Sequence, residues 1–214
     1  NKLELEAAAF NLPQLCRDIV ELLHPQANAK KIELQFSTNL DEAHYVVADP
    51  GRLRQVLTNL IGNAIKFTHQ GSVQLEVTQT GNDPTQDEYH FAVIDSGIGI
   101  PQQAQQALFS PFVQQDASIS RKYGGTGLGL AIGKQLVSMM GDTISVSSRL
   151  NSGSTFAFTI TLPRASVEQV KKIVTTNTNA VNSHQHFKGR LLVAEDNAVN
   201  QEVIQRMLES LGLG

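Results

Sequence analysis

Amide and ammonium side chains recur along one face of a long amphipathic segment. At 100° per residue, Asn59, Asn63 and Lys66 fall on the same side, and Arg52 and Gln55 precede them on that side. A solvated face would usually carry Glu and Lys, which are better helix formers than Asn. Carboxamide oxygens can bind Mg²⁺ without adding charge, and amide and ammonium groups donate to phosphate. The face is a candidate Mg²⁺–phosphate site, or a polar surface that happens to use Asn.

A carboxylate ends an apolar strand and is followed at once by glycines. Asp95 comes directly after the apolar run 91–94, and Gly97 and Gly99 follow it. A buried carboxylate needs hydrogen-bond donors, and the exocyclic amine of adenine is one. Glycines would let a flat base approach the backbone. The pattern suits a purine site, and it equally suits a simple strand-to-turn junction.

A second glycine-rich stretch, 124–129, precedes a predicted helix, whose first N–H groups can bind phosphate oxygens. It is not a P-loop, because the nearby Gly-Lys pair at 133–134 has the wrong spacing and is followed by Gln. It is not a dinucleotide fingerprint, because no apolar strand leads into it. The polar segment before it, 113–123, carries Arg121 and Lys122. That segment could close over a triphosphate as a lid, or could be a plain surface loop.

These residues need helices and strands to position them. Apolar spacing predicts helices over 13–28, 52–68 and 128–140, and a helix end over 1–9. Alternating or β-branched runs predict strands over 32–36, 44–49, 72–79, 89–94, 143–148 and 155–162. This layout predicts an α+β fold, a two-layer α/β sandwich with a mixed sheet on one side and the helices on the other.

The composition is that of a globular, soluble chain. Of 214 residues, 41% are hydrophobic and 17% are charged, which argues against wholesale disorder. A net charge of −3 argues against the basic surface that nucleic-acid binding needs, so we expect no nucleic-acid partner. The single Cys16 excludes an internal disulfide and any Cys-based zinc site. The chain has no apolar run long enough to span a bilayer, so we expect a cytoplasmic segment without membrane contact.

We expect a main domain over 10–163, a linker over 164–188 rich in Thr, Asn, Ser and Gln, and part of a second domain over 189–214. One strand and one helix cannot bury a core alone, so the second domain is expected to be truncated. His184 and His186 lie in the linker, and two histidines without a third ligand do not indicate a metal site.

In this order, the pieces resemble the ATP-binding catalytic domain of sensor histidine kinases, within the superfamily shared with gyrase, mismatch-repair and heat-shock-chaperone ATPases. The similarity covers roughly Phe10 to Pro163 and implies the Bergerat-type ATP-binding fold. The motifs that carry it are an asparagine box at 59–67, glycine boxes at 95–100 and 125–130, a phenylalanine box at 109–112, and a threonine element at 153–156.

The resemblance implies a role for each motif. Asp95 would accept the adenine amine, partly through water shared with Thr155. Asn59, rather than Asn63, would bind the Mg²⁺ that bridges the phosphates, and Arg121 or Lys122 would reach the γ-phosphate. The ATP-binding residues implied are Asn59, Asn63, Lys66, Phe67, Asp95, Gly97, Gly99, Ile100, Phe112, Arg121, Lys122, Gly125, Thr126, Gly127, Leu128, Gly129 and Thr155.

The last residues, 189–214, resemble the start of a response-regulator receiver domain. Glu195 and Asp196 would form part of its Mg²⁺ site, with the phosphoacceptor aspartate beyond residue 214. A kinase followed by a receiver is the order of a hybrid sensor kinase. The resemblance then makes 1–9 the end of a dimerisation stalk. It makes the stalk and the receiver the protein partners, and it implies a full-length protein anchored in the bacterial inner membrane.

One substitution separates this chain from the ATPases of the superfamily. They carry a glutamate as general base four residues before the magnesium asparagine, where this chain has Gln55, which cannot take a proton. None of the six histidines fits a His-acid-Leu-Arg-type stalk motif. We therefore expect a protein-histidine kinase fragment that binds Mg-ATP or ADP, uses no catalytic acid or base, and does not autophosphorylate alone. The alternatives are a stand-alone ATPase and a scaffold that has lost nucleotide binding.

Overall fold

The computed structural model describes residues 5–81, 86–105, 108–109 and 129–173, and the single positions 201, 205 and 208. The chain divides into two compact units, Asn1–Val170 and Lys171–Gly214. Most of the described residues belong to the first unit. In the second unit, Gln201, Gln205 and Leu208 are helical, and Glu195 and Asp196 lie outside the described residues.

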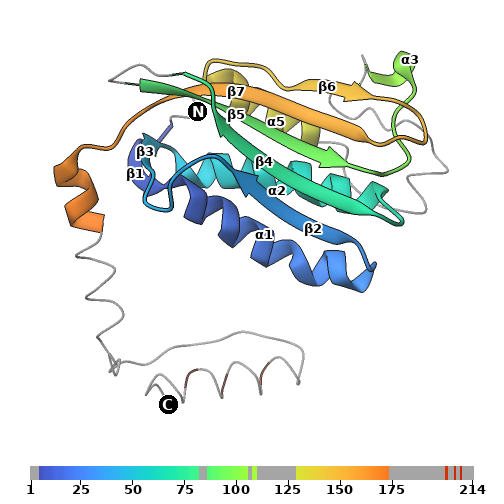
Figure 1. The fold of residues 1–214 in the computed structure, drawn as a ribbon, viewed down its shortest axis with the longest axis horizontal. Helices are drawn as coiled ribbons and strands as arrows, with labels where there is room; N and C mark the ends of the chain where they lie inside the picture. Colours follow the sequence, from blue (N-terminus) through green and yellow to red (C-terminus); the bar gives the residue numbers. More distant parts are fainter. Residues whose placement is uncertain are drawn as a thin grey trace. The chain divides into compact units, whose positions relative to one another are not determined.

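A five-stranded mixed sheet forms one layer of the first unit (Figure 1). Its strand order is β2-β4-β5-β7-β6, with β2 parallel to β4 and the other neighbours antiparallel. The strands are β2 (Glu33–Thr38), β4 (Ser72–Gln79), β5 (Gln86–Asp95), β6 (Ser145–Ser148) and β7 (Ser154–Pro163). The mixed sheet is confirmed, and the terminal hairpin is the β6–β7 pair.

In the described part of the chain, three helices form the second layer, α1 (Leu12–Ala29), α2 (Pro50–Phe67) and α5 (Gly129–Met139). Helix α2 lies between the other two and contacts β4 and β5, while α1 contacts β2 (Figure 1). A short helix, α3 (Gln102–Gln105), follows β5. The predicted two-layer α+β sandwich is confirmed.

Local sequence signals start the two long helices. Asn11 Oδ1 accepts the N–H of Gln14 at 2.9 Å, and Asp49 Oδ1 accepts the N–H of Arg52 at 2.9 Å, so each helix has an N-cap. A proline lies in the first turn of both. The face of α2 that was predicted to be apolar is buried along its whole length: Leu53, Val56, Leu57, Leu60, Ile61, Ala64 and Ile65.

The two faces of the sheet differ in burial, because the helices cover only one of them. Val93, Phe91 and Tyr89 point toward the helices and are buried. On the other face of β5, His90 and Ile94 are partly exposed. Phe91 stacks on Phe158 of β7 with ring centroids 4.9 Å apart, which fixes the middle of the core.

Residues 5–9 do not form the helix end that was predicted for 1–9, and residues 1–4 lie outside the described residues. Among the described residues, 5–7 have no regular structure and β1 (Ala8–Asn11) pairs antiparallel with β3 (Tyr45–Ala48). Phe10 packs against the core from this strand. Backbone pairing and burial outweigh the helix propensity of Glu and Ala, which is a weak local preference.

The residues after β7 stay in contact with the domain. Arg164 forms an isolated bridge to Val46, and the N–H of Ala165 donates to Tyr45 O at 3.0 Å. Ser166 and Gln169 then cap each other reciprocally and begin a helical stretch over 167–173. The expected linker thus starts as a second pairing partner of β3, beside β1. Within the described ranges, no helix has the length and apolarity that a membrane crossing would need.

Candidate nucleotide-binding site

Helix α2 carries the predicted asparagine box. Asn59 lies near its middle and Phe67 is its last residue, so about 12 Å of helix separate them. Asn63 and Lys66 are half-buried between these two points, and the Lys66 Nζ lies 5.0 Å from the centroid of the Phe67 ring. Gln55 is exposed, and its Oε1 accepts a hydrogen bond from Arg52.

The start of α5 packs directly on Asn59. A Cβ at Gly129 would overlap the Asn59 Oδ1, so only a glycine lets the two helices approach this closely. Among the described side chains, the Asn59 Nδ2 is buried without a hydrogen-bond partner. A buried amide without a partner is costly, and an unpaired donor of this kind suits an acceptor brought by a ligand.

The other end of the site is the turn after β5, which lies against the last turn of α2. The N–H of Gly97 donates to the Asp95 Oδ1 at 2.8 Å, and the N–H of Ile98 donates to Phe67 O at 3.4 Å. A Cβ at Gly97 would lie 2.7 Å from Phe67 O and 2.8 Å from the Asp95 Oδ1. The glycine is therefore needed for the turn, the carboxylate and the helix to meet.

The β6–β7 hairpin also packs against the turn that follows β5. Gly99 has φ +67° and a Cβ there would overlap the carbonyl of Arg149. Gly153 has φ +87° and a Cβ there would overlap the carbonyl of Asp95. Both positions require a residue without a side chain. The N–H of Asn151 also donates to Ile98 O at 2.7 Å, which ties the hairpin loop to the turn.

Asp95 lies in a row of residues that crosses the inward face of the sheet. The register aligns Leu34, Val73, Asp95, Ser154 and Ser148 on successive strands, so an apolar row becomes polar at Asp95. Asp95 is only 8% exposed. Burial raises the pKa of its carboxyl group, and hydrogen bonds from Gly97 and from both the N–H and the hydroxyl of Ser154 oppose that rise.

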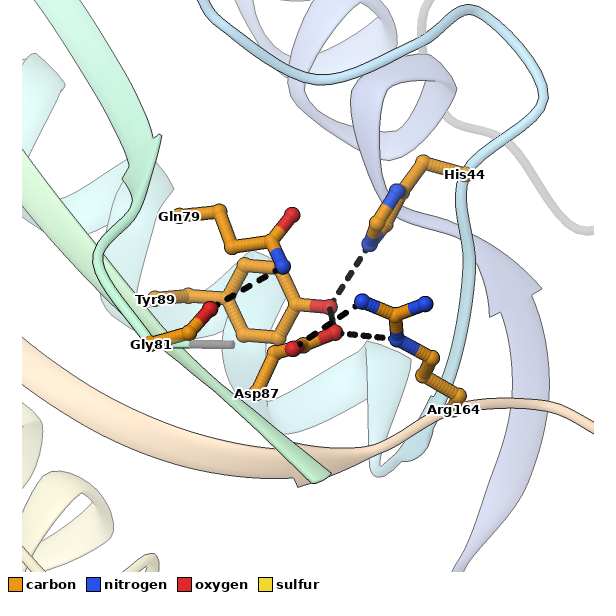
Figure 2. A network of polar contacts seen from close by, with 6 residues as sticks. All are labelled: His44, Gln79, Gly81, Asp87, Tyr89 and Arg164. Carbon is orange, nitrogen blue, oxygen red and sulfur yellow. Dashed lines mark hydrogen bonds and ion pairs between the residues drawn. The ribbon is translucent and has the colours of Figure 1, made fainter. Parts of the chain in front are cut away.

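A second buried carboxylate, Asp87, occupies the other end of the same face of β5. Its side chain is fully buried, and Arg164 pairs with both of its oxygens, which holds the pKa of Asp87 below its usual range. Figure 2 shows Asp87 between Arg164 and the hydroxyl of Tyr89, with His44 beyond that hydroxyl. Asp95, by contrast, forms no ion pair within the described part of the chain.

The residue that supports Asp95 is Ser154, not Thr155 as predicted. Successive residues of a strand point to opposite faces, and the register places Ser154 opposite Asp95 and Thr155 opposite Ile94. Thr155 therefore lies on the outer face of the sheet. Sequence reasoning also missed Ser148 and Gln105, which hydrogen-bond to this region. Only the pairing register could have identified them.

The structure therefore brings Asp95, Gly97 and Ile100 to one end of α2, and Asn59 and Gly129 to its middle. From the phenylalanine box, Phe109 packs edge-on against Phe156 at a centroid distance of 6.5 Å. The remaining predicted residues lie outside the described ranges: Phe112, Arg121, Lys122, Gly125, Thr126, Gly127 and Leu128.

A family profile described as histidine kinase-, DNA gyrase B- and HSP90-like ATPase matches residues 48–166, which is more than half of the chain. The chain belongs to this family. It is homologous to the catalytic domains of two-component sensor histidine kinases, hybrid kinases among them, and ATP binding is implied. The resemblance inferred from the five motifs is thereby confirmed.

Individual relatives agree. Sensor histidine kinase AruS of Pseudomonas aeruginosa is 39% identical over 97% of this chain and 20% of its own length. Signal transduction histidine-protein kinase BarA of Escherichia coli is 45% identical over 75% of this chain and 18% of its own. The chain thus spans about a fifth of these curated relatives.

Solved structures show the same fold. Full-length ShkA in complex with AMPPNP superposes with a TM-score of 0.65 and 31% identity, covering 100% of this chain and 41% of that one. The catalytic domain of histidine kinase ThkA, in a nucleotide-free form, superposes with a TM-score of 0.58 and 31% identity, covering 74% of this chain and 98% of that one.

Proposed function

We propose that this chain binds Mg-ATP along α2 and presents the γ-phosphate to a histidine that lies on a stalk outside these 214 residues. One observation carries the proposal. Within the described residues, Asp95 is a buried carboxylate without an ion pair, and the Asn59 Nδ2 is a buried donor without a hydrogen-bond partner. Asn59 lies near the middle of α2, and Asp95 lies beside its last turn. The carboxylate needs a hydrogen-bond donor from the ligand, and the amide NH₂ needs an acceptor. An adenine nucleotide supplies both, through its exocyclic amine and its phosphate oxygens.

The base would lie at the Asp95 end. The carboxylate already accepts from Gly97 and Ser154 and has capacity for one further donor, which the exocyclic amine of adenine provides. A guanine base would present a carbonyl oxygen at that place, and a carboxylate repels it. A Cβ at Gly97 would lie 2.8 Å from the Asp95 Oδ1, so the glycine leaves room for the base beside the carboxylate.

The phosphates would lie at the Asn59 end. The Asn59 Nδ2 would donate to a phosphate oxygen and its Oδ1 would supply an uncharged ligand to Mg²⁺, which neutralises phosphate charge during transfer. Across the described residues there is no group of three or more His, Cys, Asp or Glu that could hold a metal. This fits an ion held mainly by the nucleotide, because Mg²⁺ is usually bound by few side chains together with substrate phosphates.

The site would position ATP rather than hydrolyse it. The superfamily's general base is replaced by Gln55, whose carbonyl oxygen is engaged by Arg52. Phosphoryl transfer depends on an aligned nucleophile and on charge stabilisation more than on a base at this point. An imidazole of a stalk histidine would be that nucleophile.

In the longer protein, we infer a histidine-bearing stalk before this domain, a receiver domain beginning near residue 189, and an anchor in the bacterial inner membrane. The support is that AruS and a hybrid histidine kinase of Dictyostelium discoideum match 97% and 100% of this chain, the region after 164 included.

Titration calorimetry of the 214-residue protein tests the proposal. The wild type should bind Mg-ADP, and Asp95→Asn should lower the affinity about tenfold or more, because the new NH₂ group faces donors where a carboxylate accepted. Incubation with γ-labelled ATP should leave no stable label on the protein until a histidine-bearing stalk is supplied. Undiminished ADP binding by the variant, or steady ATP hydrolysis well above background, would contradict the proposal.

A further inference from the structure

One helical turn after the glycine-rich turn carries a glutamine side chain back onto it. The N–H groups of Ala104 and Gln105 donate to Pro101 O at 2.9 and 3.3 Å, which closes the short helix α3. The Gln105 Nε2 then donates to Ile100 O at 2.9 Å and to Ser148 O at 2.8 Å, so both hydrogens of the amide group are used. One side chain therefore joins the end of the turn to the edge strand β6.

The same strand holds the other polar group of the Ile100 backbone. The N–H of Ile100 donates to the Ser148 Oγ at 2.8 Å, and the Ser148 hydroxyl donates to Gly153 O at 2.8 Å. Ile100 is half-buried, and its side chain packs against the core. Backbone groups in such a place need hydrogen-bond partners. Ile100 finds both of them on side chains, one from β6 and one from α3.

The turn that ends at Ile100 is the one that begins with Asp95. Inside it, the N–H of Gly97 donates to the Asp95 Oδ1 at 2.8 Å, and Ile98 O accepts the N–H of Asn151 at 2.7 Å. A hydrogen bond weakens when its acceptor turns away, so a carboxylate that must meet one amine needs neighbours with fixed contacts of their own. The Gln105 amide provides such a contact at the far end of the turn.

We propose that Gln105 is a positioning residue for adenine recognition: by clamping Ile100 to β6, it fixes the turn that orients the Asp95 carboxylate toward the exocyclic amine. The inference rests on the proposed function, because it assigns Gln105 to the adenine end of that site. Gln105 does not touch the nucleotide in this scheme. About 12 Å of α2 separate the phosphate end, at Asn59, from the last turn of the helix, so phosphate binding should not depend on the clamp.

The test compares two nucleotides that differ only in that amine. Calorimetric affinities for Mg-ADP and for the diphosphate of purine riboside, which lacks the 6-amino group, give a discrimination ratio for each protein. Gln105→Met keeps the length of the side chain and removes both donors. Its affinity for ADP should fall about threefold to tenfold, the scale of one hydrogen bond. Its affinity for the amine-free nucleotide should change by less than about twofold, since that nucleotide makes no use of the Asp95 acceptor.

Further variants separate the donors from the bulk of the side chain. Gln105→Lys offers an ammonium group to the same two carbonyls, as Lys30 does at the end of α2, and should return the ratio toward the wild-type value. Gln105→Glu keeps the shape but turns acceptors toward two carbonyl oxygens, so it should lower the ratio at least as far as methionine and carries the test if Gln105→Met does not fold. Gln103→Met and Gln103→Glu, at an exposed position of the same helix, are the matched controls and should leave both affinities unchanged.

Amide hydrogen exchange gives a second readout. In Gln105→Met the N–H groups of Ile100 and Asn151 should exchange about threefold faster or more, while that of Phe91, in the middle of the sheet, should keep its wild-type rate. An unchanged ratio in Gln105→Met and Gln105→Glu, or an equal loss for both nucleotides, would overturn the inference while the proposed function stands. Failure of the wild type to bind ADP would overturn both.

Discussion

At the scale of single residues, two buried carboxylates on one strand show how neighbours decide the use of a side chain. Asp87 is matched by Arg164, and its pKa is lowered. Within the part of the chain that the structure describes, Asp95 has hydrogen-bond donors and no ion pair, and its pKa is raised by burial. The first satisfies its charge within the protein and serves stability. In the proposed function, the second would keep an acceptor available for a ligand, which is what a recognition site requires.

Gly129 offers a test at the same scale, because a methyl group there acts on one side chain. The added Cβ would overlap the Asn59 Oδ1 and push the carboxamide aside. Gly129→Ala should therefore lower the affinity for Mg-ATP about tenfold and weaken its dependence on Mg²⁺ concentration, as measured by calorimetry.

The matched control is one turn later on α5. A Cβ at Gly133 would lie 3.6 Å from the Ile144 Cδ1 and 3.7 Å from the Asn59 Nδ2, which is ordinary contact. Gly133→Ala should keep the wild-type affinity and raise the free energy of unfolding by up to about 1 kcal/mol through helix propensity. Equal effects of the two substitutions on binding would contradict the role given to Asn59.

At the scale of elements, α2 would carry the proposed site, and its C-terminus is held by Lys30, the residue that follows α1. The Lys30 Nζ donates to Ile65 O at 2.8 Å and to Lys66 O at 2.7 Å, where the last carbonyls of a helix lack partners. A cation at this end also complements the helix dipole. The contact keeps the last turn of α2 ordered next to Gly97 and Asp95.

Replacing this lysine should show how much the contact stabilises the helix end. Lys30→Met keeps the length of the side chain and removes the ammonium group, so the free energy of unfolding should fall by about 1 kcal/mol in urea titrations. Lys31→Met is the control, because the exposed Lys31 side chain has no ion pair or hydrogen bond to the described residues. A similar loss in both variants would contradict the capping role.

At the scale of the whole first unit, the entering and leaving segments of the domain meet on one strand. Strand β1 pairs with one edge of β3, and Arg164 and Ala165 pair with the same strand. The Arg164 side chain then reaches Asp87 on β5 (Figure 2). The two ends of the domain are therefore fastened to a common strand, far along the sheet from Asp95.

Acid should weaken the ion pair between Arg164 and Asp87. Because Arg164 lowers the pKa of Asp87, the pair stabilises the fold above about pH 4 and loses its effect as the pH falls through the lowered value. Arg164→Met should lower the free energy of unfolding by about 1–2 kcal/mol at pH 7, a moderate figure because the Arg164 side chain is half exposed.

The difference between this variant and the wild type should shrink in urea titrations at pH 4 and pH 3, since a protonated Asp87 no longer needs a cation. The pKa of His44 is lowered by burial and by Arg164, so Arg164→Met also changes the titration of His44, and both proteins are compared in a His44→Gln background. A difference that stays constant from pH 7 to pH 3 would contradict the assignment to Asp87.

Much of this architecture could be predicted from local pattern. The 3.6-residue period of α2 identified its buried face and, by exclusion, the side on which Asn59, Asn63 and Lys66 lie. Alternation identified the strands, and the order of the motifs identified the family. These features depend on residues near one another in the chain, so periodicity and spacing are enough to predict them.

Contacts between distant segments could not be predicted in this way. The helix expected over 1–9 is in part a strand, because β3 offers a pairing edge. Ser154 replaces Thr155 as the partner of Asp95 because the register of β5 and β7 decides which residues share a face. The pairing of Asp87 with Arg164 joins residues 77 positions apart. The sequence by itself therefore determined the family, the element types and the chemical character of the site. Only the tertiary structure decided which side chains meet, because strand register and helix approach are set by packing across the whole sheet.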